Sequence, residues 1–182
     1  MRIVRGRCKS SVALFVLAVL GALPGSVFAQ QGDDSAPMHY KFTLASVCGS
    51  YGATATYGAN IARALGTETM DGKGKLTGAA IVNQPGPNNT RTITSIGLAG
   101  TYTVNPDGTG VMVLTVTLPG GAMASVTEDF VITKAKVVDG IAIATEIQDA
   151  QEQPSAVIDN SALVIHSYTL RGTPKACGSV PY

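Results

Sequence analysis

Short segments in which apolar and polar residues alternate make up most of the second half of this chain. The alternation is clearest in residues 111–118, 127–136, 141–147 and 162–170. Successive side chains of a β-strand point to opposite faces, so a period of two predicts strands with one face on a core. We therefore expect an all-β domain.

Turn signals separate these segments. Residues 69–77 and 104–112 both contain Asp-Gly-x-Gly between strand-like arms. Asp-Gly is a strong hairpin signal because glycine accepts the positive φ that tight hairpin turns require. Residues 118–122 and 138–141 have the same character, so the strands that they join should be antiparallel neighbours.

About eight strands joined by tight turns must protect their edges. Closure into a barrel removes the edges, and pairing as two sheets hides them less completely. We expect an up-and-down, calycin- or lipocalin-like barrel of about eight strands, with a two-sheet β-sandwich as the alternative. Residues 60–66 are predicted to form one short helix, capped by Asn60 and ended by Gly66. Residues 83–89 and 149–154 read as polar loops.

Residues 1–29 have the pattern of a signal peptide and not that of part of the folded domain. A basic stretch precedes the mostly apolar residues 11–20, and Val-Phe-Ala ends at Ala29. This order is typical of a signal peptide, and the apolar run is shorter than the roughly 20 residues of a membrane anchor. We expect a signal peptide over residues 1–29, a disordered arm over 30–38 and a barrel domain over 39–182. The mature protein would be periplasmic or extracellular.

Loss of the leader changes the charge balance. The chain has 13 basic and 12 acidic residues, and the leader contains four of the basic ones, which leaves nine against 12 and a net charge of −3. Without a basic cluster, nucleic acid is not expected as a partner. No second apolar stretch is long enough to span a membrane.

Two cysteines, Cys48 and Cys177, lie beyond the leader. In an oxidising compartment an even pair predicts a disulfide, and two separate buried thiols are the alternative. Two cysteines without histidines at ligand spacing do not predict zinc. We expect neither a metal nor a cofactor.

Three strings resemble a family. Residues 49–52 read Gly-Ser-Tyr-Gly, residues 71–78 read Asp-Gly-Lys-Gly-Lys-Leu-Thr-Gly, and residues 100–110 read Gly-Thr-Tyr-Thr-Val-Asn-Pro-Asp-Gly-Thr-Gly. They resemble a group of exported bacterial proteins without an assigned activity, which share a signal peptide and these turn motifs. The resemblance implies an exported, β-barrel-like domain of a Gram-negative bacterium, and it implies no catalytic residue.

The strand predicted at residues 127–136 carries charges on both faces. Phe130 and Ile132 share a face with Glu128 and Lys134, whereas Asp129 points to the opposite face. The adjacent pair Glu128-Asp129 is therefore not expected to chelate a cation.

Few residues suggest a site. His166 lies in a predicted strand on the same face as Tyr168, so we expect both inside the barrel, with Glu146 opposite them. Arg63, on the predicted short helix, would lie at the barrel mouth. The alternatives are a histidine with a purely structural partner and an arginine at the surface.

Three functions are compatible with this pattern. An eight-stranded barrel is wide enough to hold one small lipophilic ligand, which favours a binding module using His166, Tyr168, Arg63 and Glu146. A structural or surface-interaction protein, antigenic and without a ligand, is the second hypothesis. A cyclase- or isomerase-like enzyme, by analogy with the barrel of the allene oxide cyclases, is the third. A polar-lined void of several hundred cubic ångströms would favour binding, and a solid core the structural role.

Overall fold

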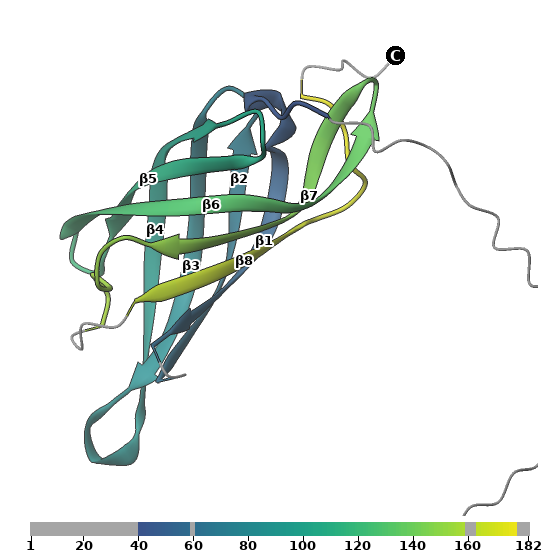
Figure 1. Cartoon of the computed structure of the whole chain (residues 1–182). Coiled ribbons are helices and arrows are strands. Elements are labelled where there is room, and N and C mark those ends of the chain that lie inside the picture. Colours follow the sequence, from purple (N-terminus) through teal and green to yellow (C-terminus); the bar gives the residue numbers. More distant parts are fainter. Residues whose placement is uncertain (1–39, 59–60, 159–162, 178–182) are drawn as a thin grey trace, which may run out of the picture. The chain divides into compact units, whose positions relative to one another are not determined.

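The computed structural model describes residues 40–58, 61–158 and 163–177, all within the compact unit Met38–Tyr182. The predicted signal peptide and the predicted arm over residues 30–38 lie outside the described residues. Eight antiparallel strands form a closed barrel in which each strand pairs with its neighbours in sequence and β8 pairs with β1 (Figure 1). The predicted up-and-down barrel is confirmed, and the β-sandwich alternative is wrong.

The strands follow one another with little irregular chain between them. They are β1 (Cys48–Tyr57), β2 (Ala62–Asp71), β3 (Lys75–Pro85), β4 (Arg91–Val104), β5 (Thr109–Thr117), β6 (Met123–Val138), β7 (Ile141–Gln151) and β8 (Val164–Leu170). Two single 3-10 turns, η1 (Leu44–Ser46) and η2 (Pro87–Asn89), are the helical elements of the described residues. The predicted loop over residues 83–89 is thus partly strand and partly η2, and the predicted loop over 149–154 begins inside β7.

The predicted short helix over residues 60–66 is wrong. Residue 60 is outside the described residues, and Ala62 begins β2, which runs through Gly66. A seven-residue segment is too short to be a stable helix alone, so tertiary pairing decides its conformation. Ala62 and Ala64 point to the interior and Arg63 points outward, which is the alternation of a strand.

The two Asp-Gly-x-Gly motifs form the predicted hairpin turns. Asp71 Oδ1 accepts hydrogen bonds from the backbone N–H of Lys73 at 2.7 Å and of Lys75 at 2.9 Å. Asp107 Oδ1 similarly accepts from the Thr109 N–H at 3.0 Å. The glycine after each aspartate has a positive φ, 72° at Gly72 and 90° at Gly108, which other residues rarely adopt.

One end of the barrel is filled. The chain before β1, with η1, lies at this end, at the top of Figure 1. Tyr102 Oη anchors this segment by donating to the Val47 carbonyl at 2.7 Å, and Tyr51 Oη of β1 donates to the Ala144 carbonyl of β7 at 3.0 Å. The largest apolar side chains fill the space around them. They include Met70, Leu76, Met112, Phe130 and Ile147.

The Cys48–Cys177 disulfide lies at the same end. The Cα atoms of the two cysteines are 5.8 Å apart, and the residues are separated by 129 positions. The predicted disulfide is confirmed. A Cβ atom at Gly72 would lie 2.8 Å from Cys177 Sγ, so the β2–β3 turn packs directly against the bridge.

An irregularity interrupts the pairing of β6 with β7. Ile132 pairs with Ile147, then Lys134 with Glu146, and then Ala135 with Ala144, so the register shifts on both sides of Lys134. Such a bulge changes the face to which a side chain points. Lys134, predicted to share the inner face of Phe130 and Ile132, is therefore exposed.

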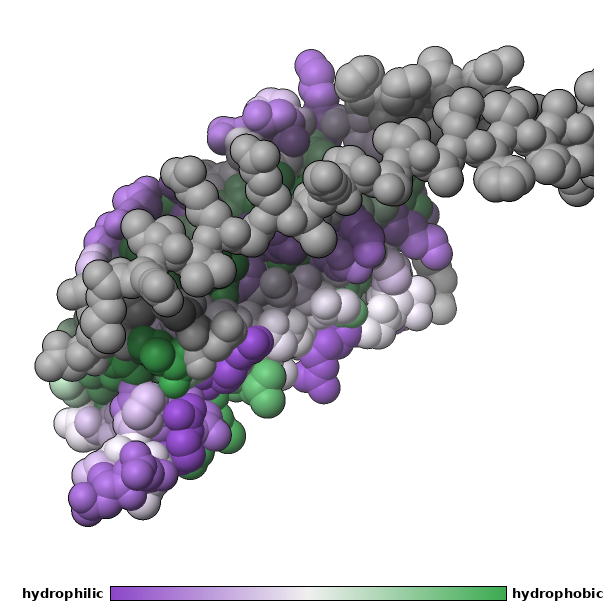
Figure 2. Space-filling view, turned by 60° about the horizontal axis from the view of Figure 1, so that its bottom comes forward, coloured by the Kyte–Doolittle hydropathy of each residue, from purple (hydrophilic) through white to green (hydrophobic). Residues whose placement is uncertain are grey.

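Apolar side chains also lie among polar ones on the outer surface of the barrel (Figure 2). Leu65 of β2 pairs in register with Ile81 of β3, and these side chains are 67% and 53% exposed. The helices that the described residues form are too short to cross a membrane.

Candidate functional site: a pocket with buried carboxyl groups

The half of the barrel opposite η1 contains a pocket. Its walls are mostly small or aliphatic side chains, and residues of the segment between β7 and β8 also line it. Among the lining residues are Ala53 and Ala55 of β1, Leu98 of β4, Val116 of β5 and Val157 of the β7–β8 segment. These small side chains leave room where bulkier ones would close the interior.

The pocket is narrow. The space between its atoms amounts to about 510 Å³, including space open to solvent, but the centre of a water-sized sphere can occupy only about 30 Å³ of it. The smaller volume is the one that decides what fits without movement, and it corresponds to a few water molecules. The interior is therefore neither a wide cavity nor a solid core.

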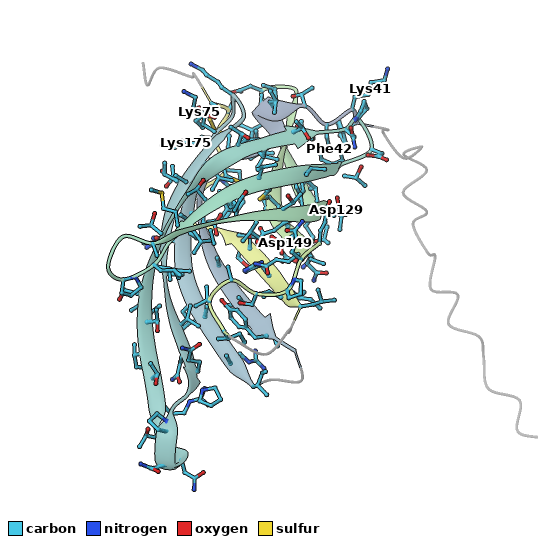
Figure 3. The ribbon with its side chains drawn as sticks, turned by 90° about the vertical axis from the view of Figure 1, so that its left-hand side faces the viewer. Lys41, Phe42, Lys75, Asp129, Asp149 and Lys175 are labelled. Carbon is cyan, nitrogen blue, oxygen red and sulfur yellow. A yellow bond between two sulfur atoms is a disulfide. The ribbon has the colours of Figure 1, made fainter. Side chains whose placement is uncertain are left out.

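Asp149 is the centre of a buried hydrogen-bond network. Its Oδ1 lies 2.7 Å from His166 Nδ1 and accepts the His166 backbone N–H at 3.1 Å, and its Oδ2 accepts the Tyr168 hydroxyl at 2.7 Å. Asp149 on β7 is opposite His166 on β8 in the strand register. Figure 3 labels Asp149 beside β8, together with Asp129, which lies on the exposed face of β6.

Two further carboxyl groups and an amide face the same space. Glu128 Oε1 accepts a hydrogen bond from Gln151 Nε2 at 3.2 Å and lies 3.7 Å from His166 Nδ1. Glu68 is 3% exposed and Glu128 is 1% exposed. Glu68 Oε2, Glu128 Oε2 and Gln151 Oε1 are buried and have no protein partner, which is uncommon for buried polar atoms.

Burial and mutual charge shift the pKa values of these groups. Burial, with a smaller contribution from the Asp149 charge, raises the pKa of Glu68 to about 7, although His166 opposes the rise. Burial also raises the pKa of Glu128. Burial disfavours the cation of His166, but its bond to Asp149 and the nearby Glu128 and Glu68 outweigh this and raise its pKa to about 9.

Asp149 and His166 are therefore an ion pair at neutral pH. Burial would raise the pKa of Asp149, but hydrogen bonds from His166 and Tyr168 and the His166 charge lower it. The pair has no net charge, and Glu68 and Glu128 hold protons that they can release near neutrality. The site can thus donate or accept a proton and can offer acceptor oxygens to a bound molecule.

Three groups of the network have the geometry to approach one metal ion. One ligand atom each of Glu128, Asp149 and His166 lies within 4.8 Å of the other two. However, His166 Nδ1 and Asp149 Oδ1 are bonded to each other at 2.7 Å, so a metal ion would have to break the shortest bond that His166 makes. The arrangement fits an ion pair better than a metal centre.

The structure brings together only two of the four predicted ligand-binding residues. His166 and Tyr168 point into the barrel as expected. Glu146, expected opposite them, lies on the outside, where it accepts a hydrogen bond from Lys134 Nζ at 2.8 Å. Arg63 lies on the exposed outer face of β2 and does not line the pocket.

Glu68, Glu128 and Asp149 were not predicted as site residues, although the alternation of each strand indicates that they face the interior. Glu68 continues the inward series of Ala62, Ala64 and Gly66, which the predicted helix concealed. Asp149 continues the inward position of Ile147, but it is the first residue of the loop predicted over 149–154. The prediction that Glu128 and Asp129 face opposite ways agrees with the burial of Glu128 and the exposure of Asp129.

Together these features define a closed eight-stranded up-and-down barrel, filled at one end and holding an acid-lined pocket at the other. No protein-family model, no curated protein sequence and no solved structure matches this chain.

Proposed function

We propose that this protein is an exported binding module for a small, thin, mainly apolar molecule with a polar end. One observation supports the proposal most directly. The apolar pocket is also lined by Glu68, Glu128 and Gln151, each of which has a buried oxygen without a hydrogen-bond partner. Apolar walls with a few convergent polar groups are the usual composition of small-molecule sites.

The form of the pocket supports a slender ligand. Much of its 510 Å³ lies close to the wall atoms, because the centre of a water-sized sphere reaches only about 30 Å³. An unbranched alkyl chain fits such a space with less movement of the walls than a bulky ring system. The small side chains Ala55 of β1 and Ala64 of β2 keep this passage open.

A purely structural role does not account for the unpartnered oxygens of Glu68, Glu128 and Gln151. A buried carboxyl or amide oxygen without a partner costs about 1–3 kcal/mol relative to one that is satisfied. Three such atoms face one pocket, whereas the opposite half of the barrel is filled by apolar side chains and its tyrosines have partners. The concentration of unsatisfied groups at the pocket supports binding.

Octanol is expected to bind the mature protein in the pocket, with a stoichiometry of one, in isothermal titration calorimetry. The variant Ala55→Leu places a larger side chain in the lining, and we expect it to weaken octanol binding by at least about tenfold. The matched control is Thr54→Leu, which adds the same side chain to the exposed face of β1 and should bind like the wild type.

Circular dichroism of each variant establishes that the barrel is intact before titration. Equal loss of binding in Thr54→Leu and Ala55→Leu would contradict a site inside the barrel. The absence of any bound octanol in the folded wild type, together with no co-purified small molecule in native mass spectrometry, would remove the proposed function.

Export is the second element of the proposal. The disulfide supports it, because such bonds persist in oxidising compartments and are rare in the cytosol. Expressed with its leader in a Gram-negative host, the protein is expected in the periplasm or medium with an intact mass that begins at Gln30. Recovery of the full-length chain from the cytosol alone, with both remaining cysteines reduced, would contradict export.

A further inference from the structure

The unpartnered oxygens of three pocket-lining residues restrict the chemistry of the ligand. When Glu68 and Glu128 are ionised, Glu68 Oε2, Glu128 Oε2 and Gln151 Oε1 are all acceptors, and all three residues line the pocket. One of the two side-chain N–H groups of Gln151 donates to Glu128 Oε1. A ligand group that completes this site must therefore bring donors.

The charges of the interior side chains favour a cationic donor group over a neutral or anionic one. Glu68, Glu128 and Asp149 contribute three carboxyl groups to the interior, and the charge of His166 is already balanced by Asp149 at 2.7 Å. An anionic headgroup would face this excess of carboxyl groups with no unpaired cation to receive it. A cationic headgroup would instead add a second positive charge where His166 alone faces Asp149, Glu128 and Glu68.

An alkylammonium group matches these requirements. It has three N–H donors and no acceptor, like the lysine side chain, and three unpartnered acceptor oxygens face the pocket. We propose that the ligand is a primary alkylamine, bound as its cation, with its chain between the apolar walls and its ammonium group on Glu68 and Glu128. This inference rests on the proposed function and specifies the ligand class of the same pocket.

Binding of the cation should depend on pH in a defined direction. Glu68 is faced by His166 of β8 and Asp149 of β7, and the Tyr168 hydroxyl of β8 also experiences its charge. In the free protein Glu68 has a pKa of about 7, and burial also raises the pKa of Glu128 of β6, so at lower pH the ammonium group must displace protons from these carboxyl groups. Because binding of the ammonium group is coupled to loss of a carboxyl proton, the association constant of the alkylamine should rise with pH. The rise is up to about tenfold per pH unit for each proton displaced.

The experiment compares three ligands that share one chain: octylamine, octanol and octanoate. Calorimetric titrations of the mature protein are made at several values from about pH 5.5 to about pH 8, where an alkylamine stays protonated as lysine does, with a pKa of about 10.4. At the upper end we expect octylamine to bind at least about tenfold more tightly than octanol, and octanoate to bind most weakly. The octylamine affinity should increase with pH.

Variants assign the preference to the carboxyl groups. Glu68→Gln and, separately, Glu128→Gln keep the shape of the side chain, and each is expected to reduce the ratio of octylamine to octanol affinity by about tenfold. Two variants are used so that one that fails to fold does not end the test. Glu146→Gln is the matched control because it removes an exposed carboxyl group on the outside of the barrel, and it should keep the wild-type ratio.

The outcomes separate this inference from the proposed function. If octanol binds and octylamine binds no more tightly at any pH, the inference is wrong and the binding module stands. Tight binding of octanoate would also overturn the inference. If none of the three ligands binds the folded protein, both are overturned.

Discussion

Replacement of Asp149 by alanine is expected to lower the free energy of unfolding by about 3–5 kcal/mol, because it removes one member of a buried ion pair. The His166 ring and the Tyr168 hydroxyl, and with them the His166 backbone N–H, would lose the acceptors that they have at 2.7–3.1 Å. Urea unfolding followed by circular dichroism at about pH 6, where His166 with its pKa of about 9 is charged, measures the loss.

The control removes a carboxylate from the outside. Glu146→Ala breaks the bond to Lys134, whose side chain is 66% exposed, and exposed pairs contribute about 0–1 kcal/mol. We expect Asp149→Ala to be several times more destabilising than Glu146→Ala. Equal and small effects of the two substitutions would show that the Asp149 network does not hold β7 and β8 together.

A second measurement tests the same network without relying on unfolding. The chain has two histidines, so the His166 imidazole is easily followed by NMR. Asp149→Asn is expected to lower the pKa of His166 from about 9, because Asp149 is the main group that opposes the effect of burial on the cation. An unchanged pKa would mean that Asp149 does not carry the charge that the ion pair requires.

Alternation and turn chemistry were sufficient to predict the barrel. Asp71 and Asp107 each accept backbone N–H groups within their own turns, so the hairpins follow from local sequence alone. The predicted helix failed because Ala62, Arg63 and Ala64 suit a helix by intrinsic preference, and only pairing with β1 and β3 makes them a strand. In a segment this short, the intrinsic preference for helix is weaker than the strand pairing that closes the barrel.

The site was less predictable than the fold because its carboxyl groups are far apart in the sequence and come close only when the barrel closes. Glu68 and His166 are almost 100 positions apart in the chain and face each other because β1 lies between β2 and β8. The choice of Glu146 failed for a different reason. Glu146 directly precedes the inward-facing Ile147, so the alternation along β7 itself places Glu146 on the outer face, and the choice did not follow that pattern.

Removal of the disulfide is expected to have the other large effect. The double variant Cys48→Ala/Cys177→Ala should lose roughly 3–5 kcal/mol of unfolding free energy, the upper value being that of the chain-entropy model for a bridge this long. The bridge spans 129 positions and restricts the unfolded chain from its first strand to the segment after its last. Urea unfolding of the oxidised wild type and of the variant gives the difference.

Reduction of the wild type provides a matched comparison for this variant. β1 and β8 pair over seven positions without any help from the bridge, so the barrel should still close once the bond is broken. A reductant should therefore lower the stability of the wild type to that of the double variant and leave the variant unchanged. If the reductant has no effect on the exported wild type, or if both thiols react with a labelling reagent before reduction, the covalent link between the ends of the barrel is absent. Closure would then depend on strand pairing and on the Asp149 network alone, because Asp149 joins β7 to the strand that completes the barrel.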